Sequence, residues 1–229
     1  MTPRPRIVLI HATPVAVEPI REAFARLWPE AETVNLLDDS LSTDRAASQT
    51  LTDEMQRRFD TLADYSVGIG AAGILFTCSA FGPAIEAVAR RLSIPVLKPN
   101  EAMYEAALAL GRRIGMVATF APAADSMLAE FHEDAARLQP DATIDLRVVP
   151  DAMAALRSGD EARHNALVAD EVRKLSGVDV VMLAHFSTAR ALEKSTAAGT
   201  CPILTSPDAA IRKMRSLTEA AKSINPGGN

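Results

Sequence analysis

Two residues whose side chains can carry a proton, Cys78 and His185, stand 107 positions apart in a chain of 229 residues. Each follows a short apolar run, at 73–77 and 178–183, and precedes a stretch in which a helix can begin. The N–H groups and dipole at the beginning of a helix favour a thiolate, so Cys78 is a candidate base. An imidazole titrates near neutral pH, which makes His185 a candidate second acid or base.

The same offset of 107 relates other parts of the chain. Residues 94–97 (Ile-Pro-Val-Leu) match residues 201–204 (Cys-Pro-Ile-Leu), and Arg-Ile occurs both at 6–7 and at 113–114. Several anchors that share one offset indicate an internal duplication rather than two halves of similar composition. We therefore predict two similar lobes, with the following boundaries: 1–99 plus 208–229 for lobe 1, and 100–207 for lobe 2.

Apolar runs of strand length alternate with helical patterns in both halves. The expected strands are 6–11, 32–37, 73–77, 94–97, 113–119, 144–149, 178–183 and 202–204, and the expected helices are 15–27, 43–67, 83–92, 123–138 and 160–175. This alternation is typical of parallel sheets covered on both faces. The predicted fold class is α/β, with two pseudo-symmetric flavodoxin-like lobes, each a mainly parallel sheet flanked by helices, and an interlobe cleft. Because ligands bind beyond the carboxyl ends of parallel strands, Cys78 and His185 should face each other from opposite lobes.

Further polar groups follow the same strand ends. A developing enolate-like charge or a carboxylate can be held by hydroxyls and by the N–H groups at helix N-termini. The candidate substrate-binding groups are Ser79, the Ala80 N–H, His11 and Thr13 in lobe 1, and the Phe186 N–H and Ser187 in lobe 2. The competing interpretations are helix caps or turn residues for Ser and Thr, a buried structural thiol for Cys78, and a hydrogen-bonded structural histidine for His185.

Three segments carry a family resemblance that covers nearly the whole chain. Residues 76–82 (Phe-Thr-Cys-Ser-Ala-Phe-Gly), 117–119 (Val-Ala-Thr) and 181–185 (Val-Met-Leu-Ala-His) resemble the cofactor-independent aspartate/glutamate/hydantoin racemase superfamily. The resemblance implies that two duplicated lobes present thiols to opposite faces of the substrate's α-carbon. Cys78 matches the first thiol and Thr119 a substrate-facing threonine. His185 stands where the family has its second thiol.

The resemblance implies an isomerase of amino acid metabolism that needs no cofactor and no metal. It would transfer a proton at the carbon alpha to a carboxylate, in an amino acid such as Asp or Glu or in a hydantoin-like compound, with Cys78 and His185 on opposite faces. The superfamily also includes arylmalonate decarboxylase and maleate isomerase. A single-thiol decarboxylase (a lyase) or a cis–trans isomerase of a small dicarboxylic acid is therefore the alternative. A second alternative is a non-catalytic small-molecule binding protein, since two α/β lobes around a cleft also describe that class.

Composition and charge exclude other functions. The net charge of −5 argues against nucleic acid as a partner, since phosphates require a basic surface. The apolar runs are far shorter than the roughly 18–20 residues of a membrane span. Two unclustered cysteines and the lack of a signal-peptide pattern predict a cytoplasmic protein. The expected partner is a small-molecule carboxylate substrate, and assembly into a homo-oligomer is left open.

Several conspicuous residues are interpreted as structural. Residues 68–73 match GxGxxG but lie before a strand, the reverse of a dinucleotide-binding loop. Cys201 occupies an apolar strand position, and His132 and His164 are expected to be solvated on polar helices. Lys98 either reaches the cleft or caps a surface turn.

Two segments have weaker patterns. Residues 151–159 are expected to form an irregular substrate-pocket loop, and residues 211–229 are expected to pack back on lobe 1.

Overall fold

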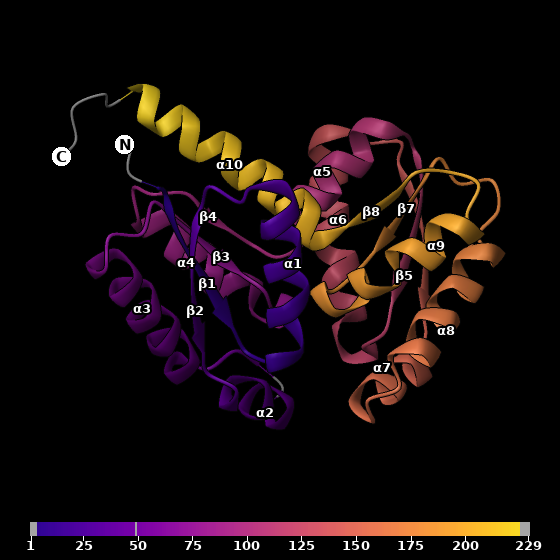
Figure 1. Ribbon diagram of the computed structural model, residues 1–229, viewed down its shortest axis with the longest axis horizontal. Coiled ribbons are helices and arrows are strands. Elements are labelled where there is room, and N and C mark those ends of the chain that lie inside the picture. The colour runs from indigo at the N-terminus through magenta and orange to yellow at the C-terminus, as the bar shows by residue number, and fades with distance from the viewer. Residues whose placement is uncertain (1–3, 49, 225–229) are drawn as a thin grey trace. The chain divides into compact units, whose positions relative to one another are not determined.

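The computed structural model describes residues 4–48 and 50–224, which form two units, each with a four-stranded parallel sheet (Figure 1). Unit 1 comprises Met1–Pro99 and Ala210–Asn229, and unit 2 comprises Asn100–Ala209. The return from unit 2 to unit 1 thus lies two residues later than the boundary expected from the repeat. The ends of the expected lobe 1, at 1–3 and 225–229, lie outside the described residues.

The sheet of unit 1 has the strand order β2-β1-β3-β4. Its strands are β1 (Arg6–His11), β2 (Glu32–Leu37), β3 (Gly73–Phe76) and β4 (Val96–Leu97). All pairs are parallel, and Ile10 is in register with both Leu36 and Phe76. The carboxyl ends of β1, β2 and β3 therefore lie level with one another, which places His11 and Thr77 at the same edge.

The sheet of unit 2 repeats this order as β6-β5-β7-β8. Its strands are β5 (Arg113–Ala118), β6 (Thr143–Val148), β7 (Val180–Leu183) and β8 (Ile203–Thr205). These pairs are parallel as well, and β5 and β7 begin 107 residues after β1 and β3. The predicted fold class, two similar α/β halves with parallel sheets flanked by helices, is confirmed.

Helices cover both faces of the unit 1 sheet. They are η1 (Pro14–Ala16), α1 (Val17–Leu27), α2 (Ser40–Ala47), α3 (Asp53–Gly68), η2 (Ser79–Phe81), α4 (Gly82–Arg91) and α10 (Ser206–Ile224). Phe59 of α3 and Val88 of α4 pack in one buried cluster with Phe76 of the sheet. On the opposite face, Met214 of α10 lies against Gly73, where the lack of a side chain allows this close approach. The expectation that the C-terminal segment packs on unit 1 is confirmed for its described part.

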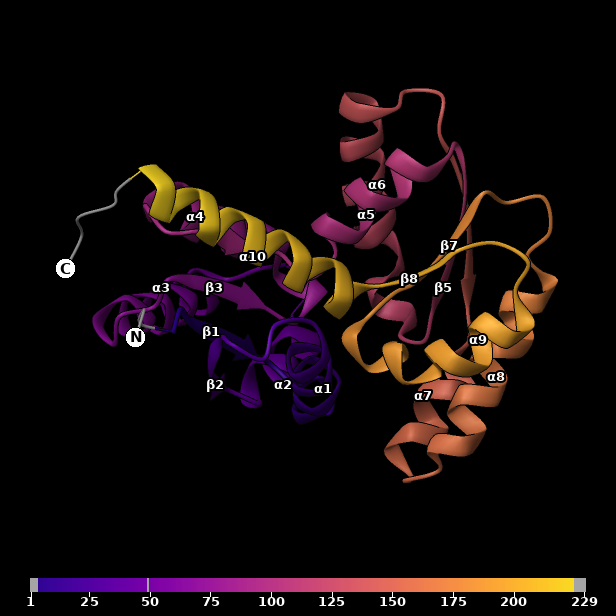
Figure 2. The ribbon, with the colours of Figure 1, turned by 45° about the horizontal axis from the view of Figure 1, so that its top comes forward.

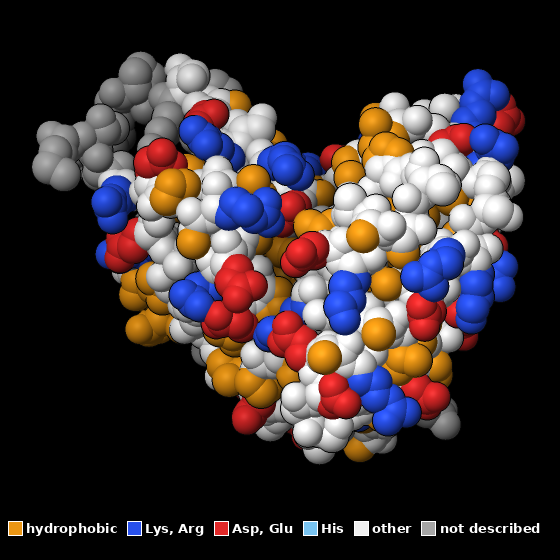
Figure 3. All heavy atoms as spheres, turned by 45° about the vertical axis from the view of Figure 1, so that its right-hand side comes forward, with side chains coloured by type: hydrophobic (Ala, Val, Ile, Leu, Met, Phe, Trp, Pro, Cys, Tyr) orange, Lys and Arg blue, Asp and Glu red, His pale blue; other side chains and the backbone are white. Residues whose placement is uncertain are grey.

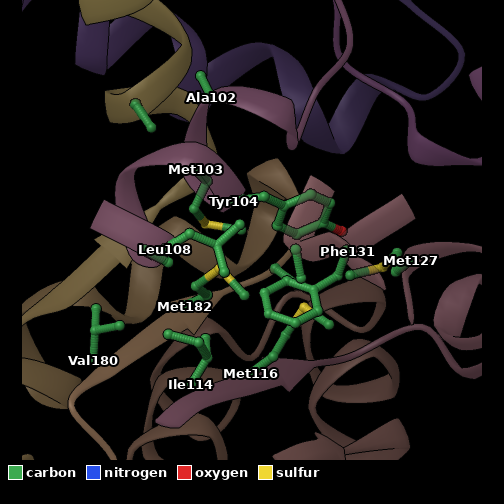
Figure 4. Close-up of a cluster of buried hydrophobic side chains, with 14 of the residues drawn as sticks. Ala102, Met103, Tyr104, Leu108, Ile114, Met116, Met127, Phe131, Val180 and Met182 are labelled. Atoms are coloured by element: carbon green, nitrogen blue, oxygen red, sulfur yellow. The ribbon is translucent and has the colours of Figure 1, made fainter. Parts of the chain in front are cut away.

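Unit 2 has a corresponding set of helices. They are α5 (Glu101–Leu110), η3 (Ala121–Ala123), α6 (Ala124–Leu138), α7 (Pro150–Arg157), α8 (Glu161–Lys174), η4 (Phe186–Ala191) and α9 (Leu192–Ala198). Helices α5 and α6 lie side by side on one face, and α7, α8 and α9 lie on the other (Figure 2). Between α5, α6 and the sheet, the Tyr104 ring packs edge-on against Phe131 at 5.8 Å, among several methionines (Figure 4).

Some helices differ from the sequence-based expectation. The single helix expected over 43–67 is wrong: the chain is extended at Ser48, and α3 begins anew where the Thr52 side chain accepts a hydrogen bond from the Met55 N–H. The irregular loop expected over 151–159 is also wrong, because α7 occupies most of it. Helices α5 and α9 were not predicted. Apolar residues occupy most positions of α5, so the sequence shows no clear amphipathic period there.

No helix among the described residues is both long and apolar enough to cross a membrane. On the face drawn in Figure 3, acidic and basic side chains are interspersed.

Candidate active site

Cys78 lies between β3 and η2, where the backbone is still extended. Its side chain is partly buried and borders a narrow, shallow hollow within unit 1. The other lining residues are 10–12, Leu41, Phe59 and Phe76. The residues around the thiol are thus mainly apolar, and His11 at the end of β1 is the polar exception among them.

Burial raises the pKa of the Cys78 thiol above its usual value. The backbone N–H of Ala80, which is directed at the sulfur, and the positive charge of Arg45 lower it, but by less than burial raises it. The expected net preference for a thiolate at the beginning of a helix is therefore wrong for this state of the protein. Cys78 is a protonated thiol at neutral pH, and the Ala80 N–H and the Arg45 guanidinium both favour its anion.

Arg45 is a site residue that the sequence did not reveal. It projects from α2, and its Nε donates to the Ala80 carbonyl at 3.2 Å while one terminal nitrogen donates to Ser48 O at 2.7 Å. The guanidinium therefore lies beside the turn that carries Cys78 and Ser79. Arg45 is one of several arginines on polar helices, and only the folded position of α2 distinguishes it.

His11, a predicted substrate ligand, is completely buried at the end of β1. Its Nδ1 lies 2.8 Å from the Thr77 hydroxyl and its Nε2 lies 2.9 Å from Asn35 Oδ1. Since an amide oxygen only accepts, Nε2 carries the proton and Nδ1 accepts from Thr77. Burial lowers the pKa of His11, and the bond to Asn35 offsets this in part. Both ring nitrogens of His11 are engaged with protein groups, so the imidazole supports the strand edge next to Cys78.

The remaining candidates of unit 1 lie around the same edge. Ser79 is buried, with 8 % of its surface exposed, and the Ala80 N–H is directed at the thiol of Cys78. Thr13 precedes η1 and its side chain makes no capping hydrogen bond. Ser79 and Thr13 therefore keep hydroxyls that are not used as helix caps.

His185 occupies the corresponding position of unit 2, between β7 and η4. Its φ of 72° lies in the left-handed region, which residues other than glycine rarely adopt. The Nε2 atom is buried and has no hydrogen-bond partner within the described residues. Burial lowers the pKa of His185 to about 4, so the imidazole is neutral at physiological pH. A strained backbone and an unsatisfied buried nitrogen together are typical of functional positions.

The neighbours of His185 come from the two residues that follow β5 and from η4. The Phe120 ring meets the imidazole edge-on at 6.5 Å. Thr119 is 1 % exposed, and its hydroxyl lies 3.4 Å from that of Thr188, which is also buried. Phe186 and Ser187 begin η4 and are buried as well. The structure thus brings Thr119, Phe186 and Ser187 together with His185 within unit 2.

Residues set aside from the sequence have mixed outcomes. His132 is exposed, as expected, whereas the expectation that His164 is solvated is wrong, because it is completely buried on the inner face of α8. Cys201 lies two residues before β8 rather than within it, and burial raises the pKa of its thiol. Lys98 forms an ion pair with Glu86 at 2.7 Å.

The glycine-rich segment 68–73 links α3 to β3, as the sequence predicted. Within residues 4–48 and 50–224, no group of three His, Cys, Asp or Glu side chains is placed to hold a metal ion.

Comparison with known proteins identifies relatives of this fold. The family model described as Asp/Glu/Hydantoin racemase matches residues 7–136. A glutamate racemase isoform from Bacillus anthracis aligns with a TM-score of 0.74 and 14% identity, over 95% of this chain and 82% of that one. Allantoin racemase from Klebsiella pneumoniae aligns with a TM-score of 0.68 and 18% identity, over 95% and 89%.

A liganded double mutant of arylmalonate decarboxylase aligns with a TM-score of 0.64 and 17% identity, over 93% of this chain and 92% of that one. A search of the curated proteins found no match. At these identities the structural likeness shows the shared fold.

Proposed function

Because the chain belongs to the Asp/Glu/hydantoin racemase family, we propose that it is a cofactor-independent racemase that uses Cys78 and His185 as its two proton carriers. The observation that carries the proposal is their equivalence. Each directly precedes the short 3-10 helix that follows the third strand of its unit. A racemase needs one proton carrier for each face of the α-carbon, and the duplicated fold supplies one from each unit.

The protonation states favour a division of roles. The pKa of Cys78 is raised and that of His185 is about 4, so the resting pair is a thiol and a neutral imidazole. In the proposed step, His185 Nε2 accepts the α-proton while the Cys78 S–H gives its proton to the opposite face of the same carbon. The products are an imidazolium and a thiolate, and both return to their resting forms by proton exchange with water. The reverse reaction begins from the imidazolium and thiolate.

Unit 1 offers stabilisation for the thiolate that this step creates. The Ala80 N–H and the Arg45 guanidinium both lower the pKa of Cys78, so both favour its anion. With Ser79 and Thr13, and with Thr119, Ser187 and the Phe186 N–H in unit 2, they form the proposed binding set for the substrate carboxylate. The proposed substrate class is an amino acid such as aspartate or glutamate, or a hydantoin-like compound.

One observation favours a second candidate. The position equivalent to Cys78 holds a histidine whose imidazole is neutral and therefore cannot donate a proton to an anionic carbon. A single-thiol enzyme, a decarboxylase or a cis–trans isomerase of a small dicarboxylic acid, needs only Cys78 as donor or nucleophile. In this alternative His185 has no proton-transfer role.

Solvent exchange distinguishes these functions. Each enantiomer of aspartate, glutamate and a 5-substituted hydantoin is incubated with the full chain in D₂O, and α-deuteration, optical rotation and CO₂ release are followed. Racemisation predicts that deuterium enters the α-position of the inverted product and that rotation decays to zero. An aryl- or alkylmalonate that releases CO₂ and gives one product enantiomer supports the decarboxylase instead. Tight binding of a carboxylate without deuteration or CO₂ release indicates the non-catalytic binding protein.

A further inference from the structure

The segment that carries His185 is held from two sides within unit 2. Helix η4 begins directly after His185, and the Thr188 N–H donates to the His185 carbonyl at 3.2 Å. The Thr188 hydroxyl lies 3.4 Å from that of Thr119 at the end of β5. At the other end of η4, Arg190 forms an ion pair with Glu161 in the first turn of α8 at 2.9 Å. One attachment therefore joins η4 to the sheet and the other joins it to α8.

The Arg190 attachment belongs to a polar cluster in which Arg190 is largely buried, His164 is buried and the Glu161 side chain is 51% exposed. The Arg190 side chain is only 17% exposed, and its Nε is buried without a hydrogen-bond partner in the described chain. His164, one turn after Glu161 on α8, is completely buried, and its Nε2 is also unpartnered. Both Arg190 and Glu161 act electrostatically on His164. Three charged or titratable side chains are thus gathered at the junction of η4 and α8.

The two unpartnered nitrogens of this cluster are complementary. His164 Nδ1 lies 2.7 Å from Asn165 Oδ1, which can only accept, so Nδ1 carries the proton. The Nε2 atom of His164 is then an acceptor, and the Arg190 Nε–H is a donor. Burial and the positive charge of Arg190 lower the pKa of His164, which keeps it in this neutral, accepting form. No hydrogen bond joins these two nitrogens in the described chain, so the ion pair with Glu161 is the contact that holds Arg190 against α8.

Unit 1 lacks this arrangement. The position 107 residues before Arg190 is Pro83, which has no charge, and helix η2 has three residues where η4 has six. The position equivalent to Glu161 is Glu54, which pairs with Arg57 on the exposed surface of α3. The attachment is thus present in the unit whose proton carrier is a histidine with a left-handed φ. Such a backbone conformation persists only where the surrounding structure enforces it.

From these contacts we infer that Arg190, held by its ion pair with Glu161, is a positioning residue that keeps η4 in the conformation in which His185 is buried and left-handed. This inference rests on the proposed role of His185. Arg190 does not act on the substrate itself. It acts through the backbone of η4, on the direction and burial of the imidazole.

The test follows the four histidines of the full chain by NMR after labelling with ¹³C,¹⁵N-histidine, and His185→Asn assigns the His185 signals. In the unaltered protein the His185 imidazole should stay neutral down to about pH 5, and its Cα and Cβ shifts should report a left-handed residue. In Arg190→Gln the titration midpoint of His185 should rise by about 1 unit or more, because a loosened η4 exposes the imidazole. Arg190→Lys should shift the His185 midpoint less, because lysine keeps the positive charge opposite Glu161. Arg173→Gln, which removes an exposed arginine of α8 that pairs with Asp170, should leave the His185 midpoint unchanged.

The inference is overturned if folded Arg190→Gln protein shows the same His185 midpoint and Cα shift as the unaltered protein, even if its melting temperature falls. An unchanged far-ultraviolet circular dichroism spectrum of the full chain verifies that the variant is folded, and Glu161→Gln replaces it if Arg190→Gln does not fold. Since the NMR readout needs no turnover, a shifted midpoint in a protein without racemase activity would retain the inference and reject the proposed function. Where turnover is measurable, kcat should fall about tenfold and KM should change little.

Discussion

Cys78 and His185 occupy the same position in two sheets of identical strand order, 107 residues apart, each directly before a short 3-10 helix. Their surroundings differ in a way that matters for proton transfer. The Cys78 turn has a nearby cation, Arg45, whereas His185 is buried without a charged neighbour that shifts its pKa. The duplication therefore conserves the position of the two groups but not their chemistry.

Replacement of Cys78 by Ala should abolish α-proton exchange and inversion, with a loss of about 10²- to 10⁴-fold in kcat, the usual range for a proton-transfer group. Cys201→Ala is the matched control. Cys201 lies before the first residue of β8, whereas His185 follows the last residue of the parallel strand β7, so this thiol is at the opposite end of the unit 2 strands from the candidate site. Deuterium incorporation by ¹H NMR measures both. Full exchange in Cys78→Ala protein would reject the role of the thiol.

Replacement of His185 by Asn removes the proton carrier and keeps a polar side chain at this position of positive φ. Inversion should fall by about 10²- to 10⁴-fold while the protein stays folded. The single-thiol alternative predicts instead that His185→Asn keeps its turnover of a dicarboxylic substrate while Cys78→Ala does not. Chiral chromatography of products from both variants separates the two outcomes.

Arg45→Ala should slow alkylation of Cys78 at a fixed pH. The positive charge of Arg45 lowers the pKa of the thiol, so its removal raises that pKa further and reduces the thiolate fraction. We expect iodoacetamide labelling at pH 8 to slow by about two- to tenfold, with KM for an anionic substrate raised. Arg57→Ala, which removes an exposed arginine paired with Glu54, is the control. Equal labelling rates in the two variants would contradict the assigned role of Arg45.

The stability of the fold should decline as the pH falls below about 6.5. Burial lowers the pKa of His11, His164 and His185 in the folded state, so the unfolded chain binds more protons below the ordinary histidine pKa. The stability is complete above about 6.5 and is lost progressively on acidification, for His185 until about pH 4. The His185 contribution is on the order of 3 kcal/mol.

Urea unfolding at pH 7.5 and pH 5 measures this effect. The difference between the two pH values should be smaller in His185→Asn than in the unaltered protein. It should be unchanged in His132→Gln, which removes an exposed histidine. An identical pH dependence in all three proteins would show that His185 titrates normally in the folded state.

Met214→Ala should destabilise unit 1 by about 2–4 kcal/mol, because it removes a fully buried side chain packed against Gly73. Leu217→Ala, on the same helix but 37% exposed, should cost less than about 1 kcal/mol. Denaturant unfolding followed by Trp28 fluorescence reports unit 1, since Trp28 directly follows α1. Equal costs would show that α10 does not contribute to the core.

Much of the architecture could be predicted from local patterns. Buried parallel strands are continuous apolar runs, as in β1, and both β1 and the more exposed edge strand β2 were predicted at their observed bounds. The 107-residue offset predicted the repeated strand order, because duplicated sequence folds into duplicated structure. The helices that escaped prediction have weak periodic signals: α5 is apolar on most sides, and the interruption between α2 and α3 depends on a single capping threonine.

The candidate site was predictable only in part. Strand ends marked Cys78, His185 and their neighbours, since the topology of a parallel sheet brings its carboxyl ends to one edge. No local pattern marked Arg45 or Arg190, because a polar helix of mixed charge does not reveal which side chain turns towards a distant segment. His164 was misjudged for the same reason: its helix is polar, but its own position lies on the inner face beside Val168.

The sequence by itself determined the two α/β halves, the family and the pair of residues at equivalent strand ends, since these depend on hydrophobic periodicity, repeat spacing and motif. Only the tertiary structure decided the state of those residues. The pKa of a thiol or an imidazole depends on burial and on charges brought together from distant segments, and the thiolate expected at Cys78 was lost to desolvation. The left-handed backbone of His185 is likewise imposed by the packing around η4, which no short stretch of sequence encodes.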